Sequence, residues 1–177
     1  MFLYHIINRI TYPEEKDLQF VSVYEFAAAS QSYGHKDFDA YYQMWDDFIE
    51  RSVDTSKKIV FGYSTHADYE ENARFLPYYQ QLHPDREVEL VNTDTLDDLL
   101  RVLGRSSVVV AARMHIFILD YGFDNRQVVF PISEKLRSYD KMYVASRPDI
   151  AKIQGQVSRM LDSILDETEH GANPRGR

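Results

Sequence analysis

The chain has 177 residues, of which 44% are hydrophobic and 27% charged, and its formal net charge is −8 at pH 7. This composition is typical of a globular protein of one domain, and it excludes a disordered or collagen-like chain. The acidic balance argues against a nucleic-acid-binding protein, which needs a basic stripe to meet the phosphates. The chain has no cysteine, which excludes disulfides and thiol chemistry.

The sequence also predicts where the protein resides. No apolar run reaches the roughly 18 residues of a transmembrane helix. The first residues, MFLYHIINRITYPEEK, lack the basic start, apolar stretch and cleavage site of a signal peptide. We therefore expect a cytoplasmic protein with no integral membrane segment. Residues 1–17 are interpreted as an N-terminal segment or interdomain remnant, 18–168 as the folded domain and 169–177 as a flexible tail.

Strands are expected where β-branched and aromatic residues gather in short runs. The runs lie at residues 18–24, 58–63, 88–91, 107–111 and 127–132.

Helices are expected between these runs, because apolar residues recur there every three or four positions. The expected helices begin at Asp37, at Asp68, at Thr95 and at His115, and a long final helix begins at Ser146. Within them, Pro77 should kink or end its helix and Gly104 should close its own. Residues 27–36 are expected to form a loop.

The alternation of strands and helices predicts right-handed βαβ units. The fold class is therefore α/β: a three-layer, Rossmann-like domain with a mostly parallel sheet covered on both faces. In such sheets, ligands bind beyond the carboxyl ends of the strands.

Arg113 and His115 follow the strand at 107–111 directly and open the next helix. An arginine fork grips a carboxylate or phosphate with two parallel hydrogen bonds, and a helix N-terminus adds partial positive charge. A histidine beside it can exchange a proton near neutral pH. The pattern favours an anion site. The alternatives are that Arg113 pairs with an acid of the same domain and that His115 only caps the helix.

The stretch SVVVAARMHIFILDYGF, followed by QVVFPISEK, resembles the closing motif of the polysaccharide pyruvyl transferase family. In that family a strand ends in a small residue, followed by Arg, an apolar residue and His. An apolar helix with a Gly near its end, a further strand and a Lys come next. The matching positions here are Arg113, Met114, His115, Gly122 and Lys135. The order of elements also fits, from about residue 18 to residue 165.

The resemblance implies one half of a GT-B-type fold, the C-terminal half. It implies transfer of a pyruvyl group from phosphoenolpyruvate to a hydroxyl of a sugar or lipid-linked oligosaccharide in bacterial surface-polysaccharide synthesis. Arg113 would then hold the donor anion, His115 would bind it or act as general acid, and Lys135 would add positive charge near the phosphate. No cofactor is implied. Since the chain resembles one half only, it is expected to be inactive alone and to need a partner subunit or a second copy.

A second group of polar residues lies in YSTHADYEEN, residues 63–72, after the strand at 58–63. Ser64 and His66 are predicted to line the same sheet edge as Arg113 and to contact substrate. Asp68 is interpreted as the N-cap of the next helix. His66 and Asp68 have no third ligand nearby in sequence, so no metal site is expected.

Two other functions remain open from the sequence. The first is a truncated, non-catalytic relative that binds a sugar or a protein partner, which the 13 tyrosines would suit. The second is the nucleotide-sugar-binding half of a glycosyltransferase-like enzyme.

Overall fold

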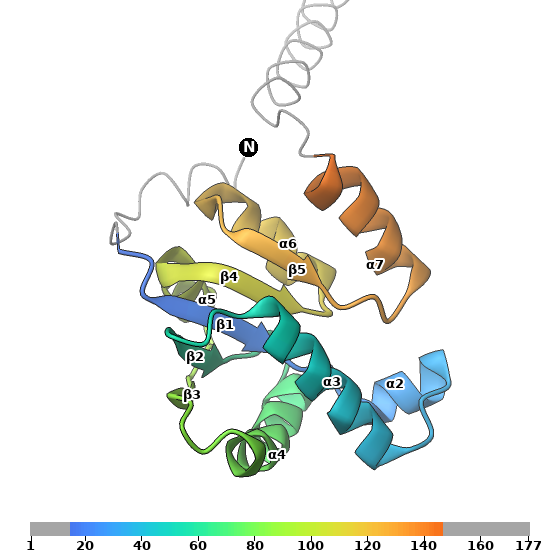
Figure 1. Cartoon of the computed structure of the whole chain (residues 1–177). Coiled ribbons are helices and arrows are strands. Elements are labelled where there is room, and N and C mark those ends of the chain that lie inside the picture. The colour runs from blue at the N-terminus through green and yellow to red at the C-terminus, as the bar shows by residue number, and fades with distance from the viewer. Residues whose placement is uncertain (1–14, 147–177) are drawn as a thin grey trace, which may run out of the picture. The chain divides into compact units, whose positions relative to one another are not determined.

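The computed structural model describes residues 15–146, and the chain divides into two compact units, Met1–Asp140 and Lys141–Arg177. The expected final helix from Ser146, the tail and the segment 1–14 therefore lie outside the described residues, apart from Ser146 itself. In the first unit five strands form one sheet of order β3-β2-β1-β4-β5, in which all neighbours are parallel (Figure 1). The strands are β1 (Leu18–Ser22), β2 (Lys58–Phe61), β3 (Val88–Leu90), β4 (Ser106–Ala111) and β5 (Arg126–Val129).

The strands at the centre of the sheet are almost continuously apolar, which is typical of strands covered on both faces. Every residue of β1 is buried, and so are the last four residues of β4. β1 lies between β2 and β4, where Phe20 is paired in register with Val60 on one side and with Val109 on the other. The α/β prediction with a parallel sheet is confirmed.

The helices cover both faces of this sheet. Figure 1 shows α3 and α4 in front of the strands and α5 and α6 behind them. The α-helices are α2 (Phe26–Tyr33), α3 (Phe38–Ser52), α4 (His66–Leu82), α5 (Leu96–Arg105), α6 (Met114–Asp120) and α7 (Glu134–Tyr139). A 3₁₀ turn, Tyr121–Phe123, follows α6, and a π-helical turn, Asp140–Ala145, follows α7.

Side-chain caps fix several helix starts. Asp37, Thr65, Thr95 and Ser133 each accept a hydrogen bond from the backbone N–H three residues later. Such a bond satisfies one of the otherwise unpaired donors of a first helical turn. The predicted starts at Asp37 and Thr95 are confirmed.

An aromatic core joins α3 to the sheet. The Trp45 ring is stacked on Phe130, just after β5, with 3.8 Å between centroids. Phe61 of β2 packs against Phe75 and Tyr79 of α4, and all three side chains are fully buried. These contacts hold the carboxyl ends of β2 and β5 rigidly.

Three local predictions were wrong, and a fourth was wrong in part. Residues 26–33 form a helix rather than a loop, because three alanines favour helix and Gly34, at φ +79°, closes it in the left-handed conformation. Of the two outcomes expected for Pro77, an end of the helix is excluded, because α4 continues past it to Leu82 with buried residues on both sides of the proline. α5 runs past Gly104 to Arg105. The N-cap of α4 is Thr65, not Asp68.

Within residues 15–146, no helix combines the length and the apolar character needed to cross a bilayer.

Candidate functional site

The sheet order places a topological switch point between β1 and β4. After β1 the chain proceeds to β2 and β3 on one side, and β4 leads to β5 on the other. In open parallel sheets, the crevice outside the carboxyl ends of two such strands is the usual ligand site. Residues 23–26 and 112–115 follow these two strand ends, so Arg113 and His115 lie at the switch point.

Arg113 is held by contacts within the chain. Its Nε and Nη2 donate to Oδ2 and Oδ1 of Asp68 at 2.8 and 2.9 Å, and its guanidinium lies 4.2 Å from the centroid of the Tyr24 ring. Asp68 has no exposed side-chain surface. Although burial opposes the charge, the Asp68 contacts raise the pKa of Arg113 above its ordinary value. Pairing with an internal acid, the alternative left open by the sequence, is what the structure shows.

Asp68 belongs to a buried polar face of α4 that the sequence reasoning missed. Its Oδ1 also accepts the N–H of Glu25. Asn72 exchanges two hydrogen bonds with the backbone of Val23, at 3.0 and 3.2 Å. The spacing of four between two polar residues on one helix face was the available signal.

Glu71 completes this face. One of its carboxylate oxygens accepts the N–H of Phe26 at 2.9 Å, and the other accepts the hydroxyl of Tyr42 at 2.7 Å. α4 therefore binds the backbone of the turn that follows β1 at Val23, Glu25 and Phe26, and the hydroxyl of Tyr41 on α3 donates to the carbonyl of Tyr24. This arrangement fixes the Tyr24 ring beneath Arg113.

His115 shares a 2.7 Å hydrogen bond between its Nε2 and Oγ of Ser64, which follows β2. Desolvation of the ring lowers the pKa of His115 most, and the charges of Arg113 and Lys135 lower it further, while Asp68 opposes them. The imidazole is therefore mainly neutral at pH 7. Its Nδ1 makes no hydrogen bond to any residue in the range 15–146.

Lys135 lies in the first turn of α7 with an exposed side chain, close enough for its charge to act on His115. We call Arg113, His115 and Lys135 the basic cluster. Of the residues predicted from the sequence, the structure brings these three together with Ser64. His66 lies apart from them: it is exposed, pairs with Glu70 at 3.5 Å, and lines a separate cavity.

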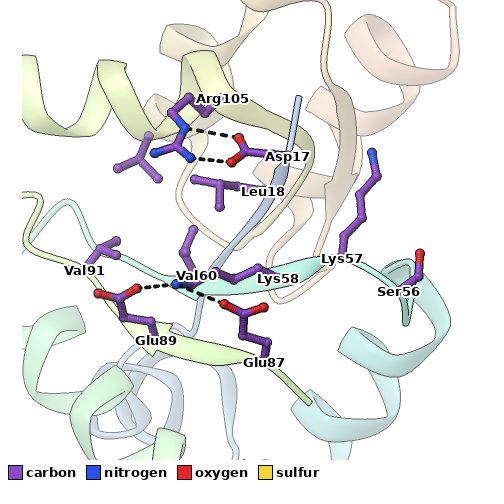
Figure 2. Close-up of a pocket in the computed structure, with 11 residues that line it drawn as sticks. Asp17, Leu18, Ser56, Lys57, Lys58, Val60, Glu87, Glu89, Val91 and Arg105 are labelled. Carbon is purple, nitrogen blue, oxygen red and sulfur yellow. Dashed lines mark hydrogen bonds and ion pairs between the residues drawn. The ribbon is translucent and has the colours of Figure 1, made fainter. Parts of the chain in front are cut away.

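A larger hollow of about 740 Å³ lies at the opposite end of the strands (Figure 2). Its charged residues pair with one another: Lys58 contacts Glu89 at 2.7 Å and Glu87 at 3.4 Å, and Arg105 pairs with Asp17. The hollow therefore presents little net charge to a ligand. Within residues 15–146, no group of three His, Asp or Glu side chains is placed to hold a metal ion.

Comparison with protein-family models, with curated proteins and with solved structures found no match to this chain.

Proposed function

We propose that this protein is a polysaccharide pyruvyl transferase-like protein whose basic cluster binds phosphoenolpyruvate. The observation that carries the proposal is the position of Arg113 and His115 beyond the carboxyl end of β4, at the switch point of a parallel sheet, where His115 is bonded to Ser64. The charge of Arg113 is balanced by Asp68, and His115 is mainly neutral at pH 7 before a ligand binds, so Lys135 and a His115 that gains a proton would supply the positive charge for an anion. An anion with a carboxylate and a phosphate beside His115 would favour that protonated form.

The structure changes the role expected for Arg113. Since Nε and one Nη2 hydrogen are directed at Asp68, the bidentate face is occupied from within. Nη1 makes no hydrogen bond to the described residues and remains for a ligand oxygen. We therefore assign a larger share of direct donor binding to Lys135 and His115, with Arg113 supplying fixed charge.

His115 is suited to couple anion binding to protonation. A dianion beside the imidazole favours its charged form and raises its pKa. In pyruvyl transfer an acceptor hydroxyl adds to C2 of the enolpyruvyl group while C3 gains a proton, which we assign to the His115 imidazolium, and the proton of the hydroxyl returns to the imidazole. The bond between C2 and the phosphate oxygen then breaks, inorganic phosphate leaves, and a second acceptor hydroxyl takes its place to complete the ketal. Ser64 orients the ring through Nε2. Within residues 15–146 no carboxylate accepts a bond from Nδ1, so this pair lacks the third member of a hydrolase triad.

The acceptor requires a second binding surface. The parallel sheet agrees with one half of a GT-B-type arrangement, and we propose that the other half is supplied by a partner polypeptide, a second copy or sequence outside this chain. Transfer needs donor and acceptor held together with water excluded. The chain alone is therefore expected to bind the donor and to show little or no transfer.

Calorimetric titration with phosphoenolpyruvate tests the proposal. Lys135→Ala should weaken binding roughly threefold, because it removes one exposed charge worth less than about 1 kcal/mol. His115→Gln should keep most of the affinity at pH 8 and lose the gain that wild type shows at pH 6. Lys57→Ala, at the opposite sheet edge, is the matched control and should bind as wild type does. Equal affinity in all four proteins would contradict the proposal.

A further inference from the structure

A cavity of about 360 Å³ opens between the carboxyl ends of β2 and β3. Its wall combines the rings of Tyr63, His66 and Tyr69 with the amide of Asn92 and the carboxylate of Asp94. This volume is in the lower part of the range of about 300–1,000 Å³ that is typical of small-molecule sites. We propose that the cavity binds a neutral polyhydroxylated ring, either a hexose or the ribose of a nucleoside.

The polar end of the cavity presents a donor and an acceptor side by side. The Tyr63 hydroxyl lies 2.9 Å from Oδ1 of Asp94 and 3.2 Å from Oδ1 of Asn92, and the Asp94 N–H donates to that same amide oxygen at 2.8 Å. Oδ2 of Asp94 and Nδ2 of Asn92 bond to none of the residues 15–146. Because each hydroxyl can donate and accept, a vicinal diol matches this pair.

These polar groups are held in place before any ligand arrives. Oγ1 of the buried Thr93 accepts the N–H of Tyr63 at 2.9 Å and donates to its carbonyl at 2.6 Å. These two hydrogen bonds join the loop after β3 to the end of β2, and they fix Asn92 and Asp94 against β2. A site on rigid strand ends loses little entropy on binding.

The apolar side of the cavity is made of ring faces and edges. Tyr69 contacts Tyr63 edge-on with 4.9 Å between centroids, and His66 is stacked on Tyr69 at 6.0 Å. Tyr69 remains 38% exposed although it is a large aromatic residue. Rings of this kind bury the C–H face of a sugar, while the diol reaches the polar pair.

Charge distinguishes this cavity from the basic cluster. Asp94 is a carboxylate, and the His66 imidazole is paired with Glu70. A phosphate is therefore disfavoured in the cavity, whereas our proposal places it at His115. The two places are connected by a short stretch of chain, because Ser64, the hydrogen-bond partner of His115, precedes His66 by two residues. The cavity and the anion site therefore differ in the ligand charge that they favour. The binding of a neutral sugar in the cavity does not rest on the proposed function.

Saturation-transfer NMR on the whole chain tests the inference, with galactose, glucose and mannose as hexose probes and adenosine and uridine as nucleoside probes. Tyr69→Ala and Asp94→Asn should each weaken sugar binding about tenfold, equivalent to about 1.4 kcal/mol. Two controls should bind as wild type does: Phe38→Ala, which removes a similarly exposed ring on α3, and Asp85→Asn, which removes an exposed carboxylate in the turn between α4 and β3. Urea unfolding of each variant verifies that it folds.

The NMR binding experiment has outcomes that support the inference and outcomes that overturn it. Binding of any probe that is lost in both cavity variants and kept in both controls supports the inference, and the probe that binds identifies the source of the diol. No binding by wild type, or binding that both cavity variants retain, overturns it. Sugar binding without phosphoenolpyruvate binding would overturn the proposed function alone, and the reverse result would overturn this inference alone.

Discussion

Arg113 and Asp68 form the most buried charge pair at the sheet edge, and their bond connects the end of β4 to α4 across 45 residues of sequence. The motif predicts that Arg113 binds the anion of a substrate, but in the structure Arg113 is paired with the carboxylate of Asp68 within the chain. A buried charge whose partner is removed is strongly destabilising. Activity measurements on Arg113 variants would therefore confuse lost binding with lost structure.

Arg113→Ala should lower the free energy of unfolding by about 3–5 kcal/mol, because it leaves the Asp68 carboxylate buried and unpaired. Asp68→Asn in the same chain should restore a large part of this loss, since the amide oxygen can still accept from Glu25 and the uncompensated charge is gone. Urea denaturation of the single and double variants measures both effects. A double variant less stable than Arg113→Ala would show that the charge is not the cause.

Asp120 gives a second prediction at this scale. Burial raises the pKa of this carboxyl to about 6 from its ordinary 3.8, although Asn125 and Gln127 donate to it. Between pH 3.8 and pH 6, Asp120 is ionised in the unfolded chain but keeps its proton in the folded chain. Stability should therefore fall as pH rises from 3.8 to 6, by about 3 kcal/mol for a shift of about two pKa units.

The comparison that isolates Asp120 is wild type against Asp120→Asn, which cannot titrate at this position. The free energy of unfolding of wild type minus that of the variant should decrease from pH 3.8 to pH 6 and level off above pH 6. Other titrating groups are common to both proteins, so their contributions cancel in this difference. Urea unfolding at pH 4, 5, 6 and 7 provides the data. Parallel stability curves for the two proteins would refute the raised pKa.

At the scale of elements, Gly62, which directly follows β2, allows the backbone there to lie close to the Phe20 side chain of β1. A Cβ built at this position would lie 2.4 Å from Cε2 of Phe20 and 3.3 Å from Cγ2 of Thr93. Phe20 is fully buried and cannot move away freely. Glycine is therefore required for the close approach that places Tyr63 and Ser64 at the sheet edge.

Gly62→Ala should destabilise the protein by about 1–3 kcal/mol through overpacking. In a Phe20→Leu background the same substitution should cost less, because the ring carbon that it meets is absent. Gly34→Ala is the control: its Cβ meets open space, and its cost of about 1–2 kcal/mol comes from φ +79° alone. Thermal or urea unfolding of wild type and the four variants checks this, and equal costs of Gly62→Ala in both backgrounds would be inconsistent with the clash.

The elements that the sequence predicted are those whose signal is local. Apolar runs located all five strands, and side-chain caps located the starts of α3 and α5. The helix α2 was missed because its alanines carry no amphipathic pattern, and only the closing glycine marks it. Asp68 was misassigned because a carboxylate at the third position of a helix looks like a cap until its partner, 45 residues away, is known.

The same limit applies to the site. Strand-end position was enough to predict that Arg113, His115 and Ser64 would share one edge of the sheet. The His115–Ser64 bond, the Tyr24 ring beneath Arg113 and the separate cavity at His66 depend on the order β2-β1-β4, which no local pattern specifies.

For the whole molecule, the net charge is −8, and the proposed anion site relies on the charges of Lys135 and of a His115 that gains a proton. Long-range repulsion of an anion by the net charge of −8 is screened beyond about 8–10 Å at physiological salt, whereas charges next to the ligand act fully. Phosphoenolpyruvate affinity should therefore depend on the basic cluster rather than on the net charge. Binding should also draw a proton onto His115.

The pKa of the His115 imidazole, measured by NMR titration of its ring resonances with and without saturating phosphoenolpyruvate, tests the central claim most directly. His115→Gln assigns the resonances. The account predicts a free-state pKa below 6.5 and a rise by about one unit when the dianion binds, because an adjacent opposite charge favours the imidazolium. A His115 pKa that phosphoenolpyruvate leaves unchanged would contradict the claim that this anion binds at the basic cluster.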